Sequence, residues 1–292
     1  MPSAPWIPPL PAVARVTRDL IKVSGPDTIG FLQGQLSQDV AALEVGRTAW
    51  SFVLQPQGKV DAWVRVHRTG DAEIAIDVEC GCGPALLTRL QRFKLRTDCD
   101  LALDEAVPTV SVRGTTLARG LSSGWPSVGG SDLIGADAIP RDLPAGTAEL
   151  DDDGFDVVRI ACGVPAMGRE MTEATIPAEV GQWVIDASVS FTKGCFTGQE
   201  LVARIDSRGG NVPRRLRGFI AGTPAPSTGA PLVVDGATVG AVTSSATASD
   251  GTVVGLAYVK RGVDVPVTAT VAAAEGAATT VELRPLPLFL LQ

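Results

Sequence analysis

The segment Lys193-Gly194-Cys195-Phe196-Thr197-Gly198-Gln199-Glu200 gathers a cation, a thiol, two glycines and a polar pair. Gly198 and Thr197 are suitable cap residues for a helix that begins near Gln199. A helix N-terminus and a neighbouring lysine both favour thiolate over thiol, so Cys195 and Lys193 are the candidate catalytic residues. The free N–H groups there also suit an anionic ligand. The alternative is a turn with an exposed lysine and a buried thiol, since isolated cysteines are usually packing residues.

The sequence of this segment resembles the hallmark motif of the YgfZ-type folate-binding proteins, relatives of the T-protein (aminomethyltransferase) of the glycine cleavage system. Members of that family usually show Lys-Gly-Cys-Tyr/Phe-x-Gly-Gln-Glu here. Residues 24–40 look like the family's opening helices, and residues 159–171 are similar to the T-protein stretch that ends in Gly-x-Glu. Residues 239–259 look like its C-terminal barrel. The resemblance covers most of the chain, from about residue 13 to about residue 285.

The resemblance implies the α+β class, with a T-protein-like multi-domain fold around a central folate cleft and a small C-terminal β-barrel. The length of 292 residues also exceeds one ordinary core and predicts two or three domains. We expect a discontinuous folate-binding domain at 13–48 plus 106–215, an inserted α+β domain at 49–105 and a β-barrel domain at 216–292.

The spacing of apolar residues predicts the elements that would position the motif. Alternation predicts strands in the first third of the chain, at 15–23, 50–54, 60–67 and 73–78. An amphipathic helix is predicted over 84–92, and another strand around 101–103. Strands followed by a helix and a strand form an α+β layer rather than a doubly wound fold. Short strands separated by turns between 233 and 271 predict a small barrel or sandwich.

Folate has a flat, amide-like pterin edge and an acidic glutamate tail. The donors of that edge suit the two oxygens of a carboxylate, and Glu170 matches the T-protein glutamate that recognises it. The alternative for Glu170 is a solvated surface carboxylate. The tail needs cations, and residues 204–217 hold five arginines opposed only by Asp206; a solvated basic face or a short nucleic-acid contact is the alternative there. The predicted cofactor-binding residues are Glu170, Lys193, Cys195, Gln199, Glu200 and Arg204.

The segment Asp61-Ala62-Trp63 departs from the T-protein pattern. The T-protein carries a paired Asp-Asp here, and one of those carboxylates is needed for aminomethyl transfer. Asp61 matches the first aspartate, and Ala62 or, in another register, Trp63 takes the place of the second. The acid function is lost in both registers, so the sequence leaves open whether the protein is an enzyme.

Composition excludes several functions. A net charge of −7 argues against nonspecific nucleic-acid binding. The single histidine, His67, lies in an alternating segment and is expected to be an exposed strand residue, which leaves little for a metal site. The Cys80-Gly81-Cys82 segment is predicted to be a turn before a helix, and the five cysteines form no cluster-binding pattern. With no membrane-spanning run and no signal-peptide pattern, we expect a cytoplasmic protein with no membrane contact.

The resemblance implies a role in the assembly or repair of certain iron–sulfur enzymes, with tetrahydrofolate or a one-carbon derivative as the ligand. The implied partners are folate and iron–sulfur enzymes or their assembly factors; a nucleic acid is not expected. Two alternatives stay open. One is a true folate-dependent aminomethyl or one-carbon transferase, and the other is a tRNA-modification accessory protein that uses the arginine stretch.

Overall fold

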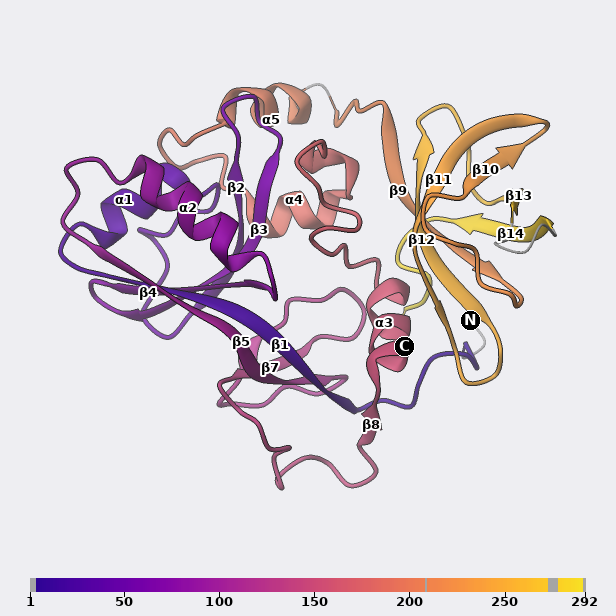
Figure 1. The fold of residues 1–292 in the computed structure, drawn as a ribbon, viewed down its shortest axis with the longest axis horizontal. Coiled ribbons are helices and arrows are strands. Elements are labelled where there is room, and N and C mark those ends of the chain that lie inside the picture. Colours follow the sequence, from indigo (N-terminus) through magenta and orange to yellow (C-terminus); the bar gives the residue numbers. More distant parts are fainter. Residues whose placement is uncertain (1–3, 208, 273–277, 291–292) are drawn as a thin grey trace.

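The structure is a computed structural model that describes residues 4–207, 209–272 and 278–290. It consists of a large curved sheet with helices on both faces and a closed barrel beside it (Figure 1). The eight-stranded sheet has the order β2-β3-β4-β1-β5-β7-β6, with β8 beside β1, and the barrel has the order β10-β11-β12-β9-β14-β13. The predicted α+β class and C-terminal barrel are confirmed.

The strands have the following bounds. The sheet contains β1 Ala12–Ser24, β2 Thr48–Leu54, β3 Val60–Gly70, β4 Glu73–Glu79, β5 Asp100–Arg113, β6 Leu121–Ser122, β7 Gly130–Ile134 and β8 Ala148–Leu150. The barrel contains β9 Arg214–Ala221, β10 Pro231–Val234, β11 Ala237–Thr247, β12 Val253–Lys260, β13 Val267–Ala272 and β14 Ala278–Arg284. The helices are α1 Thr28–Gln35, α2 Gly83–Phe93, α3 Asp152–Ala161, the short 3-10 helix Pro177–Glu179, α4 Gln182–Ser188 and α5 Gln199–Asp206.

The long strands β1 and β5 organise the sheet. They pair antiparallel along their length, with a register shift between Arg18 and Leu20. Beyond that shift, β1 pairs with β4 on its other edge, from Arg18 to Ser24. A bulge increases the local twist of a strand, and the sheet curves so that its far strand β7 approaches β3: Arg65 of β3 contacts Asp132 of β7. This curvature creates the hollow that holds the candidate site.

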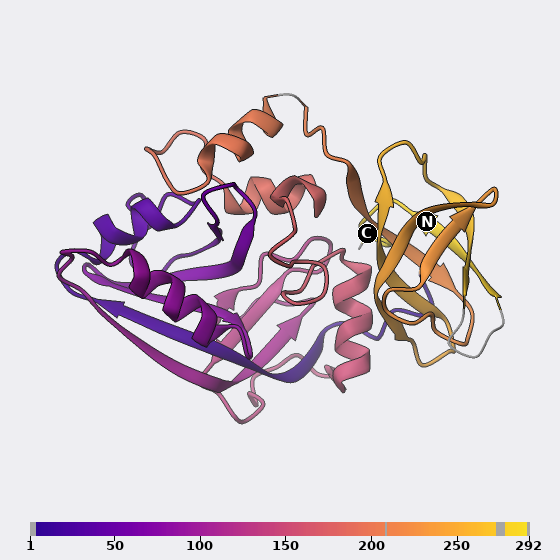
Figure 2. The same cartoon turned by 45° about the horizontal axis from the view of Figure 1, so that its top comes forward.

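The two faces of the sheet carry different layers. On one face, α1 and α2 cover an apolar cluster that includes Phe31, Leu90 and Ile76. On the other face, α3 and α4 pack with the tryptophans of β2 and β3 and with barrel strand β12 in a second apolar cluster. Figure 2 shows α3 standing between the sheet and the barrel. Because one apolar cluster includes residues of both units, the barrel is packed against the sheet rather than tethered to it.

Local sequence explains the helix ends. The Asp151 side chain accepts a hydrogen bond from the Gly154 amide at 2.8 Å and caps α3. Helix α2 begins at Gly83 with Cys82 as its cap residue, so the predicted turn at Cys80–Cys82 is confirmed. Among the described residues, no helix combines the length and apolar character needed to cross a membrane.

The predicted strands of the barrel are confirmed, and two further strands complete it. β9 and β14 pair with each other and close the barrel around Phe219 and Leu283. The strands of the predicted insert at 49–105 belong to the same sheet as β1 and β5. The division into three domains with these boundaries stays a prediction.

Candidate functional site

A cavity of about 340 Å³ lies between the curved sheet, helix α3 and the loop that follows it; we call it the central cavity. Its aromatic wall consists of Trp50, Trp63, Trp125 and Phe155. Its charged wall includes Arg18, Arg65, Arg113, Asp132 and Arg159. Its volume is near the lower end of the range for small-molecule pockets, which are also mostly lined by apolar and aromatic side chains with a few polar groups.

Hydrogen bonds fix the indole rings of the aromatic wall. Trp50 and Trp63 stack with ring centroids 4.0 Å apart. The Trp50 Nε1 group donates to the Ser123 carbonyl oxygen, and the Trp63 Nε1 group donates to Ser188 Oγ, both at 2.9 Å. Since buried indole N–H groups need an acceptor, these bonds hold the rings in one orientation.

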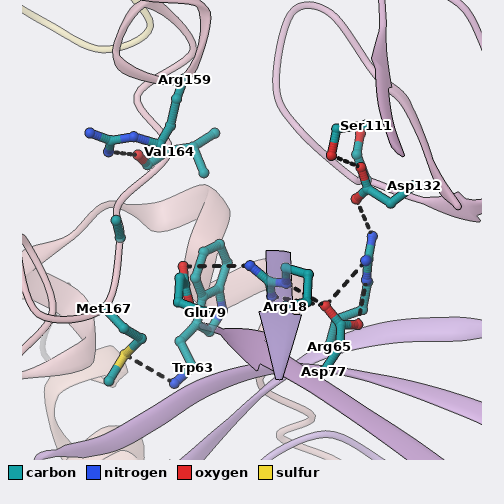
Figure 3. A network of polar contacts seen from close by, with 12 residues as sticks. Arg18, Trp63, Arg65, Asp77, Glu79, Ser111, Asp132, Arg159, Val164 and Met167 are labelled. Carbon is teal, nitrogen blue, oxygen red and sulfur yellow. Dashed lines mark hydrogen bonds and ion pairs between the residues drawn. The ribbon is translucent and has the colours of Figure 1, made fainter. Parts of the chain in front are cut away.

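Beside the aromatic wall, four buried side chains and the partly buried Arg18 form a row of alternating charge. We call it the buried charge chain: Arg18, Asp77, Arg65, Asp132 and Arg113. Figure 3 shows the part from Arg18 to Asp132. Arg18 Nε donates to Asp77 at 2.9 Å, and Arg65 joins Asp77 at 2.9 Å to Asp132 at 2.6 Å. Arg113 Nη1 then donates to Asp132 at 2.9 Å. Each aspartate therefore lies between two guanidinium groups.

For most side chains of the buried charge chain with a shifted pKa, neighbouring opposite charges together affect that pKa more than burial does. Burial alone would raise the pKa of Asp132, but the charges of Arg113 and Arg65 hold that pKa well below its usual range. Burial would likewise lower the pKa of Arg65, yet Asp77 and Asp132 raise it. At Arg113 burial is the stronger influence and its pKa is lowered. A carboxylate held this firmly in its charged form is poorly suited to donate a proton.

Two guanidinium groups of the cavity wall keep donors without a partner. The buried atoms Arg113 Nε and Arg159 Nη2 have no hydrogen-bond partner among the described residues. Arg113 also lies over the Trp125 ring, 4.0 Å from its centroid. Leaving a buried donor unpaired is costly, so these atoms favour a ligand that presents acceptor oxygens or nitrogens to this wall.

The sequence motif lies elsewhere, beside the end of helix α1. Lys193 Nζ donates to the carbonyl oxygens of Gln33 and Leu36 at 2.7 Å and of Gln38 at 3.0 Å. Burial lowers the pKa of Lys193 to about 8, against the opposing charge of Asp39. The ammonium group therefore anchors the motif loop to the C-terminus of α1, where helices leave carbonyl oxygens unpaired.

The helix predicted to begin near Gln199 is confirmed, with Gly198 as its cap residue in a left-handed conformation. The side chain of Gln199 accepts a hydrogen bond from the Phe196 amide at 3.3 Å. Cys195 is exposed, so the buried-thiol alternative is wrong, as is the alternative of an exposed Lys193. Glu200 and Arg204 are exposed on α5.

The second glycine of the motif makes a close backbone contact. A Cβ atom at Gly198 would lie 2.5 Å from the Gln55 carbonyl oxygen and 3.1 Å from the Gly58 Cα. A Cβ atom at Gly58 would in turn lie 2.6 Å from the Leu201 Cβ. Both glycines also have positive φ angles. The motif loop thus packs against the turn between β2 and β3, and each segment needs its glycine.

These placements predict different roles for the two candidate catalytic residues. We expect Cys195→Ser to leave the thermal midpoint nearly unchanged, because this side chain is exposed. We expect Lys193→Ala to lower the free energy of unfolding by about 1–3 kcal/mol, because carbonyl groups lose a charged donor. Urea unfolding of both variants measures the difference. Equal stability of the two would contradict an anchoring role for Lys193.

Glu170 is fully buried where the loop after α3 meets the barrel. One carboxylate oxygen accepts a hydrogen bond from Ser244 Oγ of β11; the other accepts from the Ala166 amide at 3.0 Å and Arg159 Nη1 at 3.2 Å. Its carbonyl oxygen accepts from the Tyr258 hydroxyl at 2.8 Å. The alternative of a solvated surface carboxylate is therefore wrong. Its recognition of a pterin edge stays a prediction.

The departure at Asp61-Ala62-Trp63 has a clear structural counterpart. Asp61 forms an ion pair with Arg89 of α2 at 2.9 Å, and Ala62 is buried in the cluster under α1 and α2. Trp63 lines the central cavity and its backbone N–H group approaches the Met167 sulfur at 3.3 Å (Figure 3). An indole ring thus stands on the cavity wall at one of the positions where a second carboxylate would be expected.

The wall of the central cavity, all of which lies in the described residues, includes none of the six predicted cofactor-binding residues. Their role in binding stays a prediction. Sequence reasoning missed the buried charge chain, although a signal was present: Arg65 and Asp77 stand inside otherwise apolar strands. Charged residues are rarely buried unless they are paired, so such positions indicate an internal ion-pair network.

The arginine stretch does not form one basic face. Arg214 pairs with Glu179 at 3.1 Å and lies over the Tyr258 ring. Arg215 donates to the Gly210 carbonyl oxygen at 2.9 Å, and Arg208 lies outside the described residues. Among the described residues of this stretch, Arg204 is the one on helix α5, while the others lie on β9.

Comparisons with known proteins show which proteins this chain resembles. No protein-family model matches the chain. It is 31% identical over 237 residues to the iron-sulfur cluster assembly factor IBA57 homolog, mitochondrial, of Mycosarcoma maydis, covering 72% of this chain and 58% of that protein. It is 26% identical over 227 residues to the tRNA-modifying protein YgfZ of Photorhabdus laumondii, covering 70% and 69%. The chain is similar to proteins of the YgfZ type.

A solved structure supports the same grouping at the level of the fold. The glycine cleavage system aminomethyltransferase T from Bartonella henselae superposes with a TM-score of 0.74 at 17% identity, covering 95% of this chain and 86% of that one. The predicted T-protein-like fold is thereby confirmed. The chain spans only 58% of the length of the IBA57 relative, so that protein has segments without a counterpart in the match.

Proposed function

We propose that the protein binds tetrahydrofolate or a one-carbon derivative in the central cavity, and that this binding supports the assembly or repair of iron–sulfur clusters in client enzymes. The observation that carries the proposal is a cavity with aromatic and arginine walls on a T-protein-like fold. The name of the IBA57 relative, an iron-sulfur cluster assembly factor, supports the second part. Iron–sulfur enzymes or their assembly factors are the proposed partners, and the cytoplasm is the proposed location.

The chemistry of the walls suits the ring end of a folate. Aromatic side chains provide apolar surface for a flat pterin. The unpaired donors of Arg113 and Arg159 suit its carbonyl oxygen and ring nitrogens. A volume of about 340 Å³ is small for a whole folate, so we expect the glutamate tail to extend outside the cavity.

Removing one aromatic wall should weaken this binding. We expect Trp125→Leu to raise the dissociation constant of tetrahydrofolate about ten-fold, because a stacked ring contributes about 1 kcal/mol beyond its buried area. Isothermal titration calorimetry under anaerobic conditions measures the change. Trp183→Leu is the matched control: Trp183 is also half-buried and lies edge-on to Trp63, but it does not line the cavity.

Two outcomes would contradict the proposed ligand. One is the absence of heat with any reduced folate at high micromolar concentration. The other is an equal loss of affinity in the Trp125 and Trp183 variants, which would show that the loss comes from general loosening of the core rather than from the cavity.

The second part of the proposal is tested in cells. We expect the wild-type gene to restore the activity of iron–sulfur enzymes in a strain that lacks its own YgfZ-type gene, and Trp125→Leu to restore it less well at equal protein level. Several relatives are named tRNA-modifying proteins, which favours a second candidate function in tRNA modification. Measuring modified nucleosides in the same strains separates the two functions.

A further inference from the structure

A second, larger hollow of about 1090 Å³ lies against the same sheet; we call it the outer groove. Its floor crosses three neighbouring strands, because Ala75 of β4 pairs with Lys22 of β1 on one side and with His67 of β3 on the other. The outer groove and the central cavity share one lining residue, Asp132. The two hollows therefore meet at Asp132 of the buried charge chain.

Apolar packing and an ion pair hold the far wall of the outer groove in place. It consists of β7 and residues 135–142, which carry Leu133, Ala136 and Ile139. These three side chains pack on an apolar cluster of β1 and β5. Arg119 pairs with Asp142 at the end of this wall. An apolar cleft with a fixed wall is the usual form of a small-molecule site.

His67 gives the floor a polar group without a partner. The sequence predicts an exposed strand histidine, but the side chain is partly buried, because the loop before β2 and the wall at 135–142 lie close to this end of β3. Burial lowers the pKa of His67, so the ring is neutral at pH 7. Its Nδ1 atom is buried and has no hydrogen-bond partner among the described residues. The ring therefore contributes an uncharged surface to the floor of the groove.

One cation of the lining, Arg141, suits an anion although the whole chain carries a net charge of −7. The lining holds three cations, Lys22, Arg119 and Arg141, and two carboxylates, Glu73 and Asp142, besides Asp132 in the buried charge chain. Lys22 pairs with Asp104, and Arg119 pairs with Asp142. Arg141 forms no ion pair with any described residue. A cation free of partners beside an apolar floor is complementary to a molecule with an apolar body and an acidic group.

We propose that the outer groove is a second binding site, separate from the central cavity, for a small apolar molecule that carries one anionic group. The apolar body lies on the floor between Lys22 and His67, and the anionic group faces Arg141. The proposal stands independently of folate binding, because it rests on a different hollow.

Two matched fluorescent probes test this site. Anilinonaphthalene sulfonate has an apolar body and one anionic group, and phenylnaphthylamine is the same body without the charge. We expect the folded protein to bind the anionic probe more tightly than the neutral one. We expect Ala75→Trp to weaken binding of both probes at least ten-fold, because the indole fills the floor. Ala102→Trp is the control for this variant. Ala102 lies on β5, is exposed and pairs with Lys22 of β1, and it does not line the groove.

Removing the free cation should affect only the anionic probe. We expect Arg141→Gln to weaken binding of anilinonaphthalene sulfonate about two- to five-fold, the range of an exposed charge interaction, and to leave phenylnaphthylamine unchanged. Arg92→Gln, at an exposed position of α2, removes the same charge away from the groove. Because Arg141 is exposed, this variant tests the proposal even if Ala75→Trp does not fold.

Three results would overturn the proposal. The first is no binding of either probe to the folded protein. The second is binding that Ala75→Trp leaves intact while Trp125→Leu removes it, which would place the probe in the central cavity. The third is equal affinity for the two probes with no effect of Arg141→Gln, which would show an apolar surface without selectivity for an anion.

Discussion

Replacing Asp132 with alanine is expected to lower the free energy of unfolding by about 3–5 kcal/mol. The substitution removes the carboxylate that Arg65 and Arg113 share. Arg65 keeps Asp77, but buried Arg113 has no other ion-pair partner among the described residues. Leaving a buried charge without its counterion is among the most destabilising changes known for single residues. Urea unfolding followed by tryptophan fluorescence measures the loss, since Trp50 and Trp125 lie beside the charge chain.

The exposed pair Arg119–Asp142 provides the control. Asp142→Ala removes one partner of an ion pair in which both side chains are more than half exposed, and such pairs contribute little. We expect its effect to stay below about 1 kcal/mol. If Asp132→Ala cost no more than Asp142→Ala, water would have to reach the charge chain, and its description as buried would be wrong.

The same carboxylate gives stability a pH dependence of definite sign. Because the pKa of Asp132 is lowered in the folded protein, its contribution is fully present above the unfolded pKa and is lost as the pH falls through the folded value. Wild-type stability should therefore decrease progressively below about pH 5, and part of that decrease should be absent in Asp132→Ala. A steeper acid response in the variant would contradict this linkage.

Replacing Glu170 with alanine is the second large effect, with an expected loss of about 3–5 kcal/mol. The substitution leaves Arg159, which is 7% exposed, with Asp156 as its remaining ion-pair partner, and it leaves Ser244 and the Ala166 amide without their acceptor. Ser244→Ala is the milder comparison and should cost about 1 kcal/mol, because it removes one hydrogen bond. Thermal unfolding of both variants ranks the effects.

Glu170→Gln separates structure from ligand recognition. The amide keeps the shape of the side chain but cannot accept at both ends. If Glu170 also contacts the pterin edge, Glu170→Gln should weaken folate binding measured at a temperature where the variant is fully folded. Unchanged folate affinity in a folded Glu170→Gln variant would show that this carboxylate only stabilises the contact between the loop after α3 and the barrel.

The local pattern of apolar and polar residues predicted much of the fold, because the conformation of many elements depends mainly on their own residues. β3 and β4 alternate apolar and polar residues, and α2 has a clear apolar stripe, so each element could be located from its own residues. β9 was missed because its first half contains three arginines, and the charged ends of Arg214 and Arg215 reach partners in other segments. Its strand conformation is set by pairing with β12 and β14, which no local window contains.

The candidate site was harder to predict for a similar reason. The motif at 193–200 is contiguous and therefore easy to find, and its helix start was predicted correctly. The wall of the central cavity takes residues from β1, β2, β3, β4, β5, β7 and α3, which only the curvature of the sheet brings together. No spacing along the chain encodes that curvature. Sequence reasoning finds contiguous groups and misses a site assembled from many segments.

The contact between Gly58 and Gly198 sets a limit on transplanting the motif between proteins. The sequence of the motif loop does not by itself determine the conformation of the loop, because Gly198 packs against the backbone of a turn that is distant in sequence. A graft of residues 193–200 into a related scaffold should fold poorly unless residues 55–58 are transferred with it. The motif is therefore a unit of two pieces, and a chimera that exchanges both is the smallest one in which the thiol of Cys195 can be compared between scaffolds.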